Sequence, residues 1–421
     1  MSSLKPIYHT CVLLLFGLLM ITLLVTCDNK SNTDPRFEDL FVKFYGGDGN
    51  QTGVDMVATD NGFVLVGNTR KLNGNSGIFI VRTDELGNEL WSNVYGNDLS
   101  IDVVDVELDN NNDVVLATTV EDNGGNKDIM FYKVSLEGLK LDSLIFGEPA
   151  FNEVANDLLI TSDGDYIITG LTTNVDVSKP AYSPDTDFED ILSVRVTSSF
   201  SVLDPAQWRK VSGFSGVDRG TALVQKIDGT FLFFGTTDRI PTGSTNPPEF
   251  NMFVFPAGSN GVANSASPFQ WLGNPQTREI SASITPTVNQ GFVLAGTAEG
   301  SNGSMNAFFA TLGNNDDIIN SGLITLENNI SVISMIEDQL RGGFFVLGNE
   351  IVNNASEISL SKITFNGILE WNRTFGNTDD DFAGSILQLS DGSIVIIGTV
   401  RLESQTKMSL IKTNSQGLLR P

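Results

Sequence analysis

A short apolar phrase recurs seven times along this chain and constrains its fold more than any other feature. One copy is LSDGSIVIIGT at 389–399. The other six copies lie at 59–69, 109–119, 162–172, 227–237, 289–297 and 341–349. Each is an apolar stretch of strand length, and most follow a turn signal such as Asp-Gly or Asn-Gly. Because the segments between the copies show no helical periodicity, the repeats predict an all-β protein.

The last small residue of each copy serves as an anchor for measuring the repeat. The anchors are Gly67, Ala117, Gly170, Gly235, Gly296, Gly348 and Gly398. Their spacings are 50, 53, 65, 61, 52 and 50 residues, and a period near fifty is typical of a propeller or solenoid. Further strands, such as 78–87 and 408–417, recur in step with the anchor. Each repeat therefore supplies about four strands, as a propeller blade does.

Aromatic residues also keep step with the repeat. Trp91, Trp208 and Trp371 each stand five residues before a turn glycine, whereas Trp271 is out of register. Large rings at equivalent positions would fill the space between neighbouring sheets. We interpret these tryptophans as core residues and not as part of a cofactor site.

The two ends of the repeat array complement each other. The last repeat ends without a fourth strand that carries the aromatic residue, and the stretch 41–47 is such a strand with no repeat before it. Pairing them would remove the exposed sheet edges of an open array. We therefore predict one seven-bladed β-propeller with four-stranded blades over 39–421, in which residues 40–45 complete the seventh blade.

This repeat resembles that of secreted and lipid-anchored bacterial β-propellers. The shared marks are Trp, a Tyr/Phe-Gly turn, an Asp, then Asp-Gly-Gly-Tyr and an apolar strand that ends in Gly, and they cover 40–417 in degenerate form. The resemblance implies the fold and an exported location. It implies little about activity, because propellers include enzymes, lectins and scaffolds.

The N-terminus indicates export. Residues 12–25 form an unbroken apolar run of 14 residues, shorter than the roughly 20 of a membrane span and suited to a signal peptide over 1–26. The alternative is an uncleaved short anchor helix. Residues 24–27 resemble the lipobox of bacterial lipoproteins, in which Cys27 would be lipidated, although Thr26 stands where that motif has Gly, Ala or Ser. Residues 27–38 would then carry the lipid and form a flexible tether.

Composition excludes several classes of function. The chain has 25 Lys and Arg against 51 Asp and Glu, a net charge of −26, which disfavours nucleic acid. The only histidine, His9, lies in the signal, which removes histidine-dependent nucleophiles and His-ligated zinc or haem. Cys11 and Cys27 leave no pair of thiols in the folded part. Carboxylate chemistry or binding remains.

Four acids stand 17 residues before an anchor, where the chain enters an innermost strand. They are Glu153, Asp218, Glu279 and Asp381. They would surround one mouth of the central channel, where converging oxygens could hold Ca²⁺. The alternative is that each acid accepts backbone N–H bonds and caps the turn at its own strand. No loop matches the spaced calcium-binding pattern, so we expect no cofactor and leave a metal open.

Blades three and four carry long inserts at 174–190 and 237–250. The two loops occupy equivalent places in adjacent blades, so they should lie side by side on the face that bears the four acids. Their aromatic and charged residues suit a sugar or a peptide, and loop drift under weak constraint is the alternative. The candidate binding residues in the inserts are Tyr182, Asp185, Asp187, Phe188, Arg239 and Phe250.

Two functions follow from these features. The first is a lipid-anchored, non-catalytic binding or scaffold module that engages a protein or glycan partner at the cell envelope. The second is a carboxylate-dependent glycan-active enzyme, a hydrolase or lyase, at the same face. We expect a monomer that does not bind nucleic acid. It would be anchored in the membrane, with the outer membrane as the expected site, and the sequence leaves both the periplasmic and the surface-facing orientation open.

Overall fold

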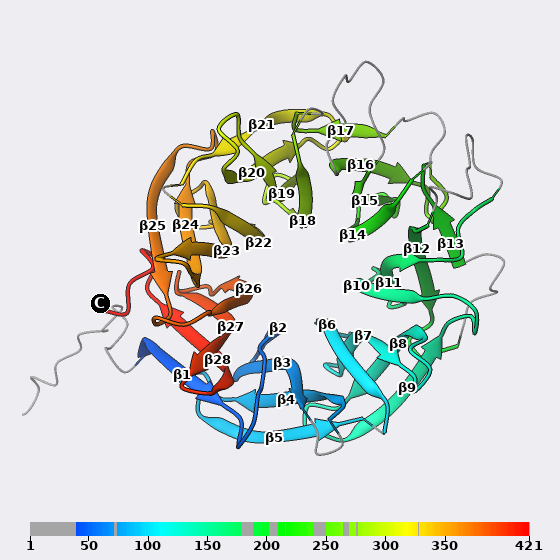
Figure 1. Cartoon of the computed structure of the whole chain (residues 1–421), viewed down its shortest axis with the longest axis horizontal. Coiled ribbons are helices and arrows are strands. Elements are labelled where there is room, and N and C mark those ends of the chain that lie inside the picture. Colours follow the sequence, from blue (N-terminus) through cyan, green and yellow to red (C-terminus); the bar gives the residue numbers. More distant parts are fainter. Residues whose placement is uncertain are drawn as a thin grey trace, which may run out of the picture.

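The computed structural model describes residues 39–70, 74–96, 98–177, 188–201, 209–214, 216–238, 250–263, 269–274, 277–326 and 328–420. These residues form 28 β-strands in seven separate four-stranded antiparallel sheets. The sheets surround a central axis as the blades of a disc (Figure 1). The prediction of a seven-bladed β-propeller is confirmed. Among the described residues, no helix has the length and apolar character needed to cross a membrane.

Each blade runs from an innermost strand at the axis to an outermost strand at the rim (Figure 1). The innermost strands are β2 (Asp55–Thr59), β6 (Ser100–Leu108), β10 (Glu153–Ile160), β14 (Asp218–Gln225), β18 (Glu279–Pro286), β22 (Ile330–Glu337) and β26 (Phe382–Gln388). The second strands are β3 (Gly62–Arg70), β7 (Val114–Glu121), β11 (Tyr166–Thr172), β15 (Phe231–Thr237), β19 (Phe292–Glu299), β23 (Phe344–Val352) and β27 (Ile394–Leu402).

The outer half of each blade contains two more strands. The third strands are β4 (Ser76–Thr83), β8 (Lys127–Val134), β12 (Asp190–Val196), β16 (Asn251–Ala257), β20 (Met305–Leu312), β24 (Ala355–Ile363) and β28 (Gln405–Thr413). The outermost strands are β5 (Glu89–Tyr95), β9 (Lys140–Phe146), β13 (Arg209–Ser212), β17 (Gln270–Leu272), β21 (Ile318–Ile324), β25 (Leu369–Phe375) and, in blade seven, β1 (Phe41–Tyr45).

The ring closes as predicted, because β1 pairs with β28 in antiparallel register, with Phe41 opposite Lys412. Phe41 replaces the tryptophan of other blades, and its ring lies against Gly87, at the turn between β4 and β5 of blade one. Tyr45 donates a hydrogen bond of 2.7 Å from its hydroxyl to the Gly87 carbonyl. Strand β1 is thus held both by its own sheet and by the next blade.

The hydrophobic core is divided into seven clusters, each shared by two adjacent blades. In β3, Val64 and Val66 pack toward blade two, whereas Phe63 and Leu65 pack toward blade seven. Successive side chains of a strand point to opposite faces, and both faces of a blade are covered. This explains why each repeated phrase is continuously apolar and does not alternate.

The anchor glycine is explained by a β-bulge in the innermost strand, which occurs in blades two to seven. A Cβ on Gly170 would overlap the carbonyl oxygen of Val154, and one on Gly398 would lie 2.6 Å from the carbonyl oxygen of Phe382. In blade two the register places Thr118, and not Ala117, at this position, since Thr118 pairs with Val103 just before the bulge. The anchor taken from the sequence is off by one residue there.

The residue after the anchor fastens its blade to the next one. Its side-chain oxygen accepts a backbone N–H at the start of the innermost strand of the next blade. The six pairs are Asn68 with Val103, Thr119 with Ala155, Thr236 with Ser281, Thr297 with Val332, Asn349 with Ala383, and Thr399 with Gly53. Blade three has Leu171 in this place, and there Asn156 donates to the Gly220 carbonyl at 2.7 Å.

Candidate functional site

The disc has two faces that differ in their loops. We call the insert-bearing face the one where the chain enters each innermost strand and where the second and third strands are joined, because the insert segments connect β11 to β12 and β15 to β16. The opposite face carries the turns between first and second strands, together with the connections between third and fourth strands, which are short in blades one, two, five and six.

The central channel contains a cavity of about 570 Å³ lined by the innermost strands of all seven blades. The residue that follows the bulge is aspartate in blades two and three and serine in blades five to seven, and Asp55 holds the equivalent place in blade one. We call Asp55, Asp105 and Asp157 the acidic arc. These three aspartates recur at the period of the repeat, which is a signal in the sequence. Only the position of the bulge, however, shows that they occupy equivalent places in their blades.

Each aspartate of the acidic arc accepts a hydrogen bond from the next blade. The backbone N–H groups of Val106, Leu158 and Leu223 donate to Asp55, Asp105 and Asp157 at 3.0, 2.7 and 2.7 Å. In the other half of the ring, the backbone N–H of Met335 donates to the Ser283 hydroxyl at 3.1 Å. The arc therefore joins blades one to four at the axis.

Three carboxyl groups of the channel, those of Asp105, Asp157 and Glu107, have raised pKa values. Desolvation, followed by repulsion from Asp55, raises the pKa of Asp105 well above its ordinary value. Desolvation raises the pKa of Asp157 to about 7 despite the hydrogen bond from Leu223. The Glu107 residue is exposed at the channel. Desolvation by the surrounding blades still raises its pKa to about 8, and repulsion from Asp55 and Asp157 adds to the effect.

The four acids predicted to surround the channel mouth are all buried, with 0 or 1% of each residue exposed. Glu153 accepts the Glu148 N–H and the Thr172 hydroxyl, at 3.2 and 3.0 Å. Asp218 accepts the Phe214 N–H at 2.5 Å.

The other two acids make similar bonds. Asp381 accepts the N–H groups of Asn377 and Arg401, both at 2.7 Å, and Glu279 accepts that of Asn274. Burial raises the pKa of Glu153 and Asp381, and it raises that of Glu279 to about 8. In this structure the acids cap turns at their own strands.

Among the described residues, no group of three or more His, Cys, Asp or Glu side chains is arranged to hold a metal ion. Cys27, Tyr182, Asp185, Asp187 and Arg239 lie outside the described residues.

The described bases of the two inserts carry aromatic and charged groups. Phe188 is 56% exposed. Arg219 Nε donates to Glu189 Oε2 at 2.6 Å, and the Arg219 guanidinium lies 5.5 Å from the centre of the half-buried Phe250 ring. Blades three and four thus present two aromatic rings and an ion pair on the insert-bearing face.

A hollow of about 570 Å³ lies on the insert-bearing face across blades five, six and seven, and we call it the blade 5–7 hollow. Its lining is mixed, with apolar, amide, hydroxyl and charged side chains. Ile280, Ile351 and Phe382 are 37, 46 and 44% exposed there. The sequence did not reveal this site, because its residues come from strand ends and adjoining loop residues of three blades.

Two carboxyl groups lie close together beside this hollow. A Cβ on Gly376 would overlap both Glu357 Oε2 and Asp381 Oδ2, so the two oxygens flank one small gap. Desolvation and then repulsion from Asp381 raise the pKa of Glu357. The neighbouring residues in sequence, Ser356 and Asp380, line the hollow itself.

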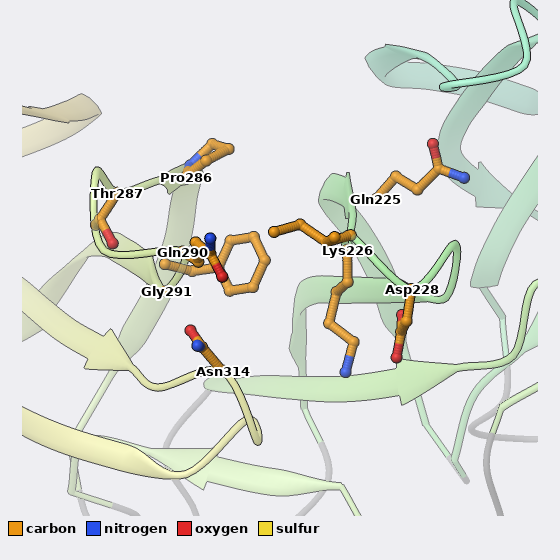
Figure 2. Close-up of a pocket in the computed structure, with 10 residues that line it drawn as sticks. Gln225, Lys226, Asp228, Pro286, Thr287, Gln290, Gly291 and Asn314 are labelled. Carbon is orange, nitrogen blue, oxygen red and sulfur yellow. The ribbon is translucent and has the colours of Figure 1, made fainter.

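The opposite face has a pocket of about 410 Å³ between blades four and five. Figure 2 shows Lys226 and Asp228 on one side of it and Thr287, Gln290 and Asn314 on the other. The Lys226 ammonium is paired with Asp316 at 2.8 Å, so the pocket offers little unpaired charge.

Comparison with known proteins shows the fold alone. No protein-family model and no curated protein sequence matches this chain. An ulvan lyase, described as a new family of polysaccharide lyase, is 8% identical over 88% of this chain and 96% of the lyase, with a TM-score of 0.53.

Two further solved structures resemble the chain more weakly. An α-L-arabinanase from Penicillium chrysogenum is 11% identical over 74% of this chain and 93% of the enzyme, with a TM-score of 0.48. A puromycin hydrolase is 9% identical with a TM-score of 0.43, and the match covers 83% of this chain and half the length of that hydrolase.

Proposed function

We propose that this chain is an exported, lipid-anchored protein that binds a protein or glycan partner at the cell envelope through its insert-bearing face, without catalysis. The observation that carries the proposal is the blade 5–7 hollow, a concave site of about 570 Å³ with three exposed apolar side chains. Ligand sites are typically concave and about 300–1,000 Å³ in volume. The aspartates of the acidic arc, by contrast, accept hydrogen bonds that join the blades.

Thermal unfolding of the full-length chain in mild detergent, against peptides and oligosaccharides, tests binding. A ligand at one hundred times its Kd stabilises the folded state by about 2.7 kcal/mol, which shifts Tm measurably. Phe382→Ala should reduce the shift, whereas Phe365→Ala, a change of another exposed phenylalanine on the opposite face, should not. Equal shifts in both variants would contradict a site on the insert-bearing face.

Membrane anchoring is tested separately. Cells that express the chain are fed a radiolabelled fatty acid and fractionated. We expect the label on the wild-type chain and its loss in Cys27→Ser, together with release of the chain from the membrane fraction. Unlabelled wild type would contradict lipidation at Cys27.

A second function is favoured by the pair formed by Glu357 and Asp381. Two neighbouring carboxyls of unequal exposure beside a hollow suit a glycan-active enzyme that uses one as acid and one as base or nucleophile. If the chain is such an enzyme, Glu357→Gln should abolish the release of reducing ends from a polysaccharide and leave binding intact. A binding module shows no turnover in either form.

A further inference from the structure

We propose that the blade 5–7 hollow binds a neutral oligosaccharide. This proposal rests on the proposed binding function and names the class of its ligand. The hollow combines a buried hydroxyl that has no partner, amide groups whose nitrogens face no acceptor, and an exposed aromatic ring. Each of these three features meets a different part of a sugar.

The first feature is the Ser356 hydroxyl. Ser356 is 6% exposed and lines the hollow, and its Oγ is buried without any hydrogen-bond partner in the described part of the chain. Its backbone is held firmly, since its N–H donates to Asp380 Oδ1 at 2.9 Å and its carbonyl accepts from Asp381 at 2.7 Å. A buried polar group without a partner is costly, and a ligand hydroxyl could both donate to it and accept from it.

The second feature is a pair of amides. Asn329 Oδ1 accepts the Met305 N–H at 2.9 Å, and Asn349 Oδ1 accepts the Ala383 N–H at 2.7 Å. These bonds fix which end of each amide faces the protein and leave the Nδ2 groups without an acceptor among the described residues. Two oriented donors at the edge of one hollow suit the hydroxyl and ring oxygens of a sugar.

The third feature is the apolar surface. The Phe382 ring is 44% exposed between the polar groups, and Ile280 and Ile351 continue the same surface. The C–H face of a sugar ring is apolar and packs on such a surface, while its hydroxyls point sideways to polar partners.

Charge favours a neutral ligand over an acidic one. The hollow has one cation, Arg278, and one carboxylate, Asp380, among its lining residues, so it has no excess charge of its own. The whole chain carries −26, which repels polyanionic glycans and acidic peptides.

The test uses the full-length chain in detergent and isothermal titration with two probe sets. One set contains neutral oligosaccharides of three to six glucose, mannose, galactose, xylose or arabinose units, together with uronic-acid oligomers of the same length. The other contains uncharged and charged decapeptides. We expect a neutral oligosaccharide to bind and the uronic-acid oligomers to bind at least tenfold more weakly.

Two variants locate the site. Ser356→Ala should weaken binding about fivefold to tenfold without lowering Tm, since the hydroxyl has no internal partner. The matched control is Ser359→Ala on the same strand, where the hydroxyl lies 2.9 Å from Glu350 Oε2 and 2.9 Å from Asn372 Oδ1. This control should lower Tm and leave the Kd unchanged.

The outcomes separate the two proposals. A peptide that binds in place of any sugar and loses affinity in Ser356→Ala and Phe382→Ala would overturn the glycan and keep the binding function. Sugar binding that neither variant changes would overturn the hollow as its site. No binding by any probe in either set would count against the glycan, and the envelope partner would then be sought as an intact protein.

Discussion

At the scale of single residues, the anchor glycine recurs because the backbone of the neighbouring strand lies too close to allow a side chain. It does not recur because the glycine takes part in binding or a reaction. The anchor glycine lies where the bulged strand brings a carbonyl oxygen against its Cα. A sequence pattern shows that a small residue recurs, but the cause is the bulge, which the pattern does not contain. For this reason the pattern alone aligns the second copy to Ala117, whereas the structure places Thr118 there.

Gly170→Ala should destabilise the fold by about 3 kcal/mol, the upper range for overpacking, because the new methyl group would overlap the Val154 carbonyl oxygen. Denaturant unfolding measures the change. Gly47→Ala is the control, since nothing lies within 4 Å of a Cβ placed there, and it should change stability by less than about 0.5 kcal/mol. Equal effects at the two positions would contradict the role of the bulge.

The pKa of Glu107 makes stability depend on pH. Folding raises this pKa from 4.5 to about 8, so the folded chain holds the proton more tightly than the unfolded chain between these values. The contribution to stability is full below about pH 4.5 and decreases as pH rises through 8. Asp157, with its pKa near 7, acts in the same direction.

Glu107→Gln should therefore flatten the decrease of Tm between pH 5 and pH 8 and raise Tm at pH 8 relative to wild type. Glu85→Gln, at an exposed turn outside the channel, is the control and should follow the wild-type curve. A Glu107→Gln variant whose Tm falls with pH as steeply as wild type would show that desolvation of Glu107 and repulsion from its neighbours do not make folding depend on pH.

At the scale of elements, strand identity and pairing could be predicted from the sequence, whereas side-chain direction at the strand ends could not. The apolar phrases, their turns and the unmatched strand at 41–47 predicted the blades and their closure, because local pattern determines them. The four acids predicted to surround the channel mouth occupy equivalent positions, yet each accepts an N–H from the loop that precedes its own strand. The blade 5–7 hollow depends on how the strand ends of three blades meet, which no local pattern records.

The fastening between blades gives a prediction at this scale. Thr399→Val removes the hydroxyl that accepts the Gly53 N–H at 3.0 Å and leaves that buried donor unpaired, at a cost of about 1–3 kcal/mol. Thr399→Ser retains the hydroxyl and should cost much less. Urea unfolding of both variants decides the question, and a loss in Thr399→Val no larger than that in Thr399→Ser would contradict the fastening role of the hydroxyl.

At the scale of the whole molecule, the seven core clusters form a closed cycle, and blade seven depends on a strand from the other end of the chain. A chain that lacks residues 1–38 retains β1 and should keep the wild-type Tm. A chain that lacks residues 1–45 exposes the edge of β28 and should show a lower Tm and association that grows with concentration. Calorimetry and light scattering measure these effects, and equal behaviour of the two truncations would contradict closure by β1.

The direction of β1 has a mechanical consequence. The strand starts at the opposite face, with Phe41 paired to Lys412, and runs to the insert-bearing face, where Tyr45 pairs with Met408. A pull on the N-terminal side, resisted by a partner held on the insert-bearing face, acts along the strand axis. Such a load shears all five residue pairs of β1 and β28 together and does not peel them apart one by one. Under the proposed function, the ring is closed by a strand whose orientation withstands tension between the proposed tether and a bound partner.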